Sequence, residues 1–124
     1  MNKIDIAVIG AGINGSSTAL HLAKTDNVSV MARREDKLNE LAEYNDHIFT
    51  QTLDVSSTGD IRGSLERCVE HFGKVDKLIY CAGKQIVKPH RMAEIEDFGS
   101  LYDVNLRGAL FTSKLFCNVK ISEK

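Results

Sequence analysis

The residues with the clearest chemical meaning form a glycine turn near the start of the chain, in the stretch Gly10-Ala11-Gly12-Ile13-Asn14-Gly15. Its spacing is Gly-x-Gly-x-x-Gly. Between a strand and a helix, such glycines allow a tight turn, a close approach of backbone to pyrophosphate, and close helix–strand packing. The helix then offers free N–H groups and a positive dipole to phosphate. We predict a dinucleotide site formed by Gly10, Gly12, Ile13, Asn14 and Gly15; the alternative is a glycine-rich turn without a ligand.

The residues after the second predicted strand indicate which dinucleotide binds. NAD and FAD sites usually carry an acidic residue there, about 20 residues past the turn, which bonds the adenosine ribose hydroxyls. This chain has Ala32-Arg33-Arg34 instead. Two guanidinium groups hold a 2′-phosphate and do nothing for a bare hydroxyl. We predict NADP (NADPH) bound by Arg33 and Arg34; the alternative is that these arginines are solvated surface charges.

Strands and helices alternate along the chain and would position both motifs. The apolar runs predict strands at 4–9, 28–32, 48–53 and 76–81, and helical spacing predicts helices at 14–24, 36–44, 57–72 and 95–119. This alternation predicts an α/β fold, a truncated, Rossmann-like, doubly wound parallel sheet of about four strands with helices on both faces. The expected strand order is 3-2-1-4. Ligands bind beyond the carboxyl ends of such strands, where both motifs lie.

Two helices carry finer signals. In helix 57–72, Ser57 and Asp60 resemble a capping pair, and Gly73 suits the far end. In helix 95–119, one stripe, more typical of core than of interface, contains Leu101, Val104, Gly108, Phe111 and Leu115.

Composition limits the class of protein. With 124 residues we expect one domain, 1–124, and a net charge of -1 gives no electrostatic case for nucleic acid. No run approaches the roughly 20 apolar residues of a membrane span, and the start lacks a secretion signal. The three cysteines match no zinc or disulfide framework, and the histidines show no metal-ligand spacing. We expect no metal, no membrane or nucleic-acid partner, and a reducing, cytoplasmic location.

Further motifs recur in order from Val28 onward. They are Ala32-Arg33-Arg34, Leu53-Asp54-Val55, Phe72-Gly73-Lys74-Val75-Asp76-Lys77-Leu78-Ile79-Tyr80-Cys81-Ala82-Gly83 and Tyr102-Asp103-Val104-Asn105-Leu106-Arg107-Gly108. With the expected elements between them, the chain resembles a short-chain dehydrogenase/reductase over almost its whole length. The resemblance implies an oxidoreductase that moves a hydride between NADPH and a small carbonyl or alcohol substrate.

The resemblance also implies roles for single residues. Asp54 matches the family aspartate that bonds the adenine amino group, and Val55 supplies a neighbouring backbone contact. Ala82 and Gly83 match the end of the family's Asn-Asn-Ala-Gly turn beside the adenine ribose. Asn105 matches the family's active-site asparagine, which kinks its helix and holds a water of the proton relay. Arg33 matches the basic residue of NADP-preferring members.

The chain departs from the family pattern in three places. The turn has the spacing of the opening of an FAD-dependent oxidoreductase rather than the family's Gly-x-x-x-Gly-x-Gly. Tyr80-Cys81 replaces the two asparagines. The family's catalytic serine and Tyr-x-x-x-Lys pair belong to a fifth strand and the helix after it, which we expect to lie beyond Lys124. Tyr80 and Lys84 have that spacing by coincidence, because four strand residues span about 13 Å.

These observations leave three function hypotheses open. The first is an NADP-dependent oxidoreductase present here as a cofactor-binding fragment. The second is a module that binds NADP or a partner chain without catalysis. The third is an FAD-binding fragment. Without a fifth strand the fourth strand is an open edge, and parallel edges are rarely exposed, so we also expect marginal stability or a homo-oligomer.

Overall fold

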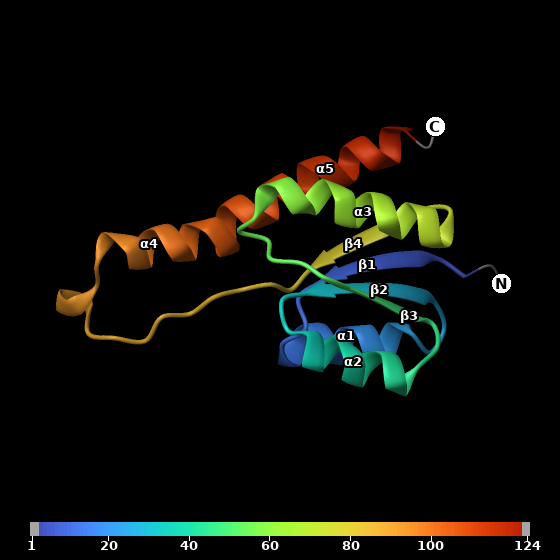
Figure 1. Ribbon diagram of the computed structural model, residues 1–124, viewed down its shortest axis with the longest axis horizontal. Helices are drawn as coiled ribbons and strands as arrows, with labels where there is room; N and C mark the ends of the chain where they lie inside the picture. The colour runs from blue at the N-terminus through green and yellow to red at the C-terminus, as the bar shows by residue number, and fades with distance from the viewer. Residues whose placement is uncertain (1–2, 123–124) are drawn as a thin grey trace.

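The computed structural model describes residues 3–122 as one parallel sheet covered by helices (Figure 1). The strands are β1 (Asp5–Ile9), β2 (Asn27–Ala32), β3 (Ile48–Thr52) and β4 (Lys77–Tyr80). The helices are α1 (Ile13–Leu22), α2 (Glu35–Tyr44), α3 (Thr58–Phe72), α4 (Ile95–Tyr102) and α5 (Ala109–Ser122), with the 3₁₀ turn η1 (His90–Met92) and the π-helical segment η2 (Asp103–Gly108). The strand order is β3-β2-β1-β4, which confirms the predicted topology.

The two faces of the sheet carry separate apolar cores. Side chains alternate along a strand, so Ile6 and Val8 of β1 face one side and Ala7 and Ile9 face the other. Helices α1 and α2 cover the first side, and α3 and α5 cover the second (Figure 1). All five residues of β1 are buried, as expected for a central strand of a doubly covered sheet.

The helix predicted over 95–119 is wrong as one continuous element. It is divided into α4, η2 and α5, and α5 continues to Ser122. The break occurs where Gly108 lets a strand side chain approach the helix, because a Cβ there would lie 2.6 Å from the Tyr80 hydroxyl. In Figure 1, α4 and the segment before it project past the carboxyl ends of the strands. The other predicted bounds agree within two residues.

The predicted glycine at the carboxyl end of α3 is confirmed, whereas the predicted capping pair at its amino end does not cap the helix. Gly73 adopts the left-handed conformation with φ 86°, and its N–H donates to the Val69 carbonyl at 2.6 Å. At the start, the Ser57 hydroxyl donates to the Asp60 carboxylate at 3.0 Å, but neither side chain caps the backbone. The pair therefore stiffens the first turn without satisfying its N–H groups.

The glycine turn joins β1 to α1 by backbone contacts that exclude side chains. Gly10 has φ 109°, and its N–H donates to the Met31 carbonyl of β2 at 2.8 Å. A Cβ on Gly10 would also lie 2.7 Å from the Ala82 nitrogen. A Cβ on Gly15 would overlap the Gly10 carbonyl oxygen and lie 2.8 Å from its carbon. The first and last glycines of the motif are thus steric requirements of the fold.

We expect Gly15→Ala to lower the free energy of unfolding by about 2–3 kcal/mol, because α1 must move away from β1 to admit the methyl group. Gly59→Ala in α3 is the matched control, since a Cβ there meets nothing within 4 Å. That control should be neutral or stabilising by about 0.5 kcal/mol, as alanine is the better helix former. Urea unfolding followed by circular dichroism measures both. Equal stability of the two variants would contradict the assigned role of Gly15.

Candidate functional site

A cavity of about 580 Å³ lies beyond the carboxyl ends of the strands, between α1, α2 and the segments after β3 and β4. Of the eleven predicted cofactor residues, nine line it: Gly10, Gly12, Ile13, Arg33, Arg34, Asp54, Val55, Ala82 and Gly83. Asn14 and Gly15 do not line it, because Gly15 packs beneath the Gly10 carbonyl and the Asn14 side chain is exposed outside the cavity. The topology therefore gathers most of the predicted residues around one space.

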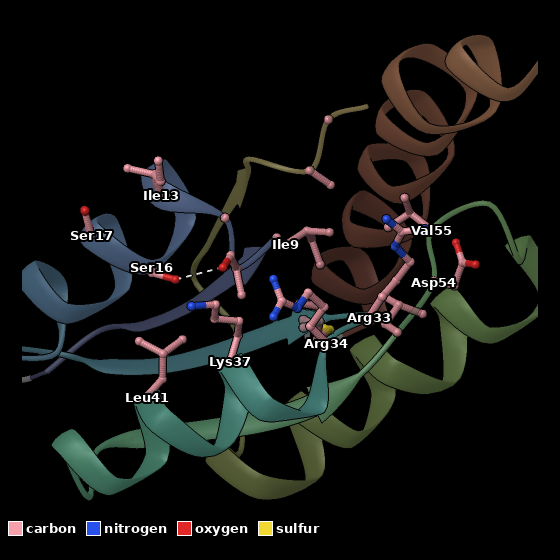
Figure 2. A pocket seen from close by; sticks show the side chains of 18 of the residues that line it. Ile9, Ile13, Ser16, Ser17, Arg33, Arg34, Lys37, Leu41, Asp54 and Val55 are labelled. Atoms are coloured by element: carbon pink, nitrogen blue, oxygen red, sulfur yellow. Dashed lines mark hydrogen bonds between the residues drawn. The ribbon is translucent and has the colours of Figure 1, made fainter. Parts of the chain in front are cut away.

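The amino end of α1 opens into this cavity without a side-chain cap. Gly12 occupies the N-cap position, where no side chain bonds the first N–H groups, and the first turn contains no acidic residue. A Cβ on Gly12 would meet nothing within 4 Å. The Ser16 hydroxyl donates to the Ala11 carbonyl at 2.9 Å, which holds the turn (Figure 2). Uncapped N–H groups with the positive end of the helix dipole form an anion site.

The two arginines occupy different surroundings. The Arg33 side chain extends toward Asp54 and Val55 (Figure 2). Arg34 instead donates to Asp36 through Nε at 3.2 Å and through Nη2 at 2.7 Å. This two-point ion pair raises the pKa of the Arg34 guanidinium and lowers that of the Asp36 carboxyl. The predicted pair therefore contains one arginine directed at the cavity wall around Asp54 and one held by its own helix.

Asp54 is an ionised hydrogen-bond acceptor at the wall of the cavity. Its Oδ1 accepts from the Ser56 hydroxyl at 2.7 Å and from the Ser56 N–H at 2.9 Å. The hydroxyl bond from Ser56 is the main cause that holds the pKa of Asp54 below its usual range, and the charges of Arg33 and Lys84 act in the same direction. Both bonds from Ser56 go to Oδ1, so Oδ2 is available as a further acceptor.

Asn105 lies in η2 and fastens the segment that follows β4. Its Oδ1 accepts from the Lys84 N–H at 2.8 Å, and its Nδ2 donates to the Lys84 carbonyl at 2.9 Å. Asn105 does not line the cavity, although Ala82 and Gly83, which precede Lys84, do. Its side chain thus positions the strand exit. The role in a proton relay that the resemblance implies stays a prediction.

Tyr80 and Lys84 do not face one another. The Tyr80 hydroxyl donates to the Val104 carbonyl of η2 at 2.6 Å, and burial raises the pKa of this phenol. The Lys84 ammonium bonds the Ser100 hydroxyl of α4. Both side chains are therefore engaged in joining β4 and its exit to the helix above, in agreement with the interpretation of their spacing as a coincidence.

Several residues around the cavity escaped the sequence analysis. Lys37, Ser16, Ser17 and Leu41 line it between α1 and α2. Lys37 could have been found, because it lies on the first turn of a helix that starts directly after the arginines. That the Lys37 side chain is directed toward α1 could be known only from the way in which α1 and α2 pack together.

Within residues 3–122, no group of three or more histidine, cysteine or acidic side chains is arranged to hold a metal ion. In the same part of the chain, no helix has the length and apolar character needed to cross a membrane.

Comparison with known proteins agrees with this geometry. Residues 1–123 match the family model described as short chain dehydrogenase. The chain belongs to the short-chain dehydrogenase family. The matched range includes the glycine turn, so the spacing at residues 10–15 is a variant within this family and not a sign of an FAD-dependent family.

Among curated proteins, the chain is similar to an uncharacterized oxidoreductase of Staphylococcus haemolyticus. The two are 31% identical over 101 residues, covering 79% of this chain and 44% of that protein. This chain is also 30% identical to an 11-beta-hydroxysteroid dehydrogenase-like protein of Arabidopsis thaliana, and the match covers 80% of this chain and 36% of the relative. The chain therefore spans less than half the length of these relatives.

Solved structures show the same fold. A short chain dehydrogenase from Bacillus anthracis superposes with a TM-score of 0.90 at 25% identity, covering 97% of this chain and 51% of that one. Actinorhodin polyketide ketoreductase, solved with NADPH, has a TM-score of 0.83 at 30% identity, covering 92% of this chain and 46% of the other. These similarities confirm a Rossmann-like short-chain dehydrogenase fold.

We expect Tyr80→Phe to lower the free energy of unfolding by about 1 kcal/mol, because the Val104 carbonyl loses its donor. Gly108→Ala should cost about 2 kcal/mol, because its methyl group would meet the Tyr80 hydroxyl. The double variant should lose less than the sum, since removing the hydroxyl relieves that clash. Thermal unfolding of the four proteins tests this. Additive losses would show that the two residues act independently.

Proposed function

We propose that this chain binds NADP in the cavity at the strand ends and forms the cofactor-binding part of an oxidoreductase. The reaction is hydride transfer between NADPH and a small carbonyl or alcohol substrate. The observation that carries the proposal is that Arg33 and Arg34, which directly follow β2, line the cavity. The strand β2 itself contributes no acidic residue to the cavity lining. A 2′-phosphate needs cations there, and a bare ribose hydroxyl needs an acceptor.

The residues present fit the parts of NADP. The uncapped N–H groups of α1 at Gly12 would bind the pyrophosphate, and the open space over Gly12 would admit it. Arg33 would hold the 2′-phosphate on the side of the cavity near Asp54. The ionised Asp54 would accept a hydrogen bond from the adenine amino group beside Val55. Ala82 and Gly83 would line the ribose.

Structural neighbours support a nicotinamide cofactor of either kind. Actinorhodin polyketide ketoreductase is described with NADPH, and a reductase 21% identical to this chain is described as NADH-dependent and in complex with NAD. The choice of NADP for this chain therefore rests on its own arginines and on their position in the cavity.

The chemistry that bound NADPH supplies is hydride donation from its nicotinamide ring. This chain's contribution is to bind and orient the cofactor, and Asn105 holds the exit of β4 in place for it. The single Tyr-x-x-x-Lys sequence in the 124 residues is Tyr80 to Lys84, and the Tyr80 hydroxyl is bonded to Val104. We propose that the general acid of the reaction is not among these residues.

A second candidate is a module that binds NADP or self-associates without catalysis. The observation that favours it is a row of exposed apolar side chains at every fourth position through α4, η2 and the start of α5. They are Phe98, Tyr102, Leu106 and Leu110. A self-associating module predicts a species larger than the monomer in sedimentation, which cofactor binding alone does not require. Free thiols at Cys68, Cys81 and Cys117 support a reducing, cytoplasmic location for either.

We expect Arg33→Gln to weaken NADPH binding about tenfold and to change NADH binding less than about twofold, because only NADPH carries the 2′-phosphate. Arg62→Gln is the control, since Arg62 is exposed on α3 outside the cavity. Calorimetric titration of each protein with NADPH, NADH and FAD measures the affinities. Tighter binding of FAD than of NADPH, or equal binding of NADPH and NADH, would contradict the assignment.

We expect the 124-residue chain alone to bind NADPH but not to oxidise it in the presence of aldehydes and ketones. The reason is that Tyr80, the tyrosine of its Tyr-x-x-x-Lys sequence, is occupied in positioning η2. The decrease of NADPH absorbance over hours, compared with a protein-free blank, measures turnover. Turnover above the blank that survives in Tyr80→Phe would show that another residue supplies the proton.

A further inference from the structure

We propose that Lys37 is the second cation of the 2′-phosphate site, in the place that the sequence assigns to Arg34. This inference rests on the proposed binding of NADP. Within the described residues, four cationic side chains line the cavity: Arg33, Arg34, Lys37 and Lys84. The proposal follows from the hydrogen bonds and ion pairs that each of these four side chains already makes.

Arg34 has the closest carboxylate partner of these four cations, although that ion pair is exposed, with side chains 66% and 60% exposed. This arginine is the N-cap residue of α2, and its guanidinium forms two hydrogen bonds with Asp36 in the first turn of the same helix. Binding a phosphate in the fork geometry that favours arginine would require both bonds to break. The resulting Asp36 carboxylate, free of its partner, would then repel the phosphate.

Arg33 and Lys84 each have contacts of their own around the cavity. Arg33 extends toward Val55 and Asp54, and its charge acts on the Asp54 carboxylate (Figure 2). Lys84 follows β4 and bonds Ser100 of α4. Lys37 enters the same cavity from α2, with its side chain extending toward the side of Ser16 in Figure 2, so a 2′-phosphate lying between Arg33 and Lys37 would meet both cations.

Lys37 is held loosely by comparison. Its ammonium lies 3.7 Å from the Glu40 carboxylate one turn along α2, and the two side chains are 41% and 66% exposed. Solvent screens exposed ion pairs, so neither this pair nor that of Arg34 contributes much; the single contact at 3.7 Å is weaker than the two hydrogen bonds between Arg34 and Asp36. The Lys37 ammonium can therefore move to a phosphate at small cost, and its flexible stem suits a point-charge contact.

Glu40 then opposes the same ligand. Its carboxylate competes with phosphate for Lys37, and it also lines the cavity, where it repels an anion. Two neighbouring side chains of α2 should therefore shift cofactor discrimination in opposite directions. A purely structural role for this turn of α2 would not produce opposite signs.

The test measures discrimination, defined as the dissociation constant for NADH divided by that for NADPH, at low ionic strength. We expect Lys37→Gln to lower this ratio about tenfold and Glu40→Gln to raise it about threefold. Arg34→Gln should lower it less than Lys37→Gln does. Lys24→Gln is the control, since Lys24 is exposed outside the cavity. The affinity for NADH, which lacks the 2′-phosphate, reports that each variant is folded.

Two outcomes separate this inference from the function on which it rests. Equal affinity of the unmodified chain for NADPH and NADH would overturn the NADP assignment, and with it the role of Lys37. Clear preference for NADPH that Lys37→Gln leaves intact, and that Arg34→Gln abolishes, would overturn the inference alone. A ratio that falls in Lys37→Gln and rises in Glu40→Gln supports both.

Discussion

The close approach of α1 to the end of β1 sets the geometry on which the rest of this molecule depends. The Gly10 carbonyl lies where a side chain on Gly15 would be, and the Gly10 N–H bonds the neighbouring strand β2. With the helix held this near, its uncapped amino end is directed at the cavity beyond the strands. The ends of β2, β3 and β4 meet at the same edge, so their polar residues surround one anion-binding helix end.

The π-helical segment η2 joins three parts of that cavity wall. The Val104 carbonyl accepts from Tyr80 of β4, and Asn105 pairs with the backbone of Lys84. A further bond runs from Arg107 to the Ser56 carbonyl, after β3. The irregular turn therefore fixes the walls around Asp54 and Gly83, which is a positioning function for residues that also match family motifs.

Charge around the cavity is arranged as local pairs rather than as a uniform basic patch. Arg34 is neutralised within α2, Lys37 is weakly paired, and Arg33 faces an ionised carboxylate. The net charge of the chain is only -1, so long-range attraction of an anionic cofactor is small. The preference for NADP that we propose would then come from short-range contacts, where one hydrogen-bonded cation changes affinity about tenfold.

Sequence alone determined the alternation of elements, the strand order 3-2-1-4, the glycine turn and the family, because these follow from local periodicity and from motifs in fixed order. Helical spacing predicted one helix over 95–119, and only the resemblance implied a kink, at Asn105 in η2; the contact of Gly108 with Tyr80, 28 positions earlier, required the tertiary structure. Sequence alone assigned both Arg33 and Arg34 to the 2′-phosphate, with only Arg33 matching the family's basic residue, and it did not include Lys37. Only the tertiary structure separated these three cations, because the direction of a side chain depends on which helix packs beside it and on which carboxylate lies within reach.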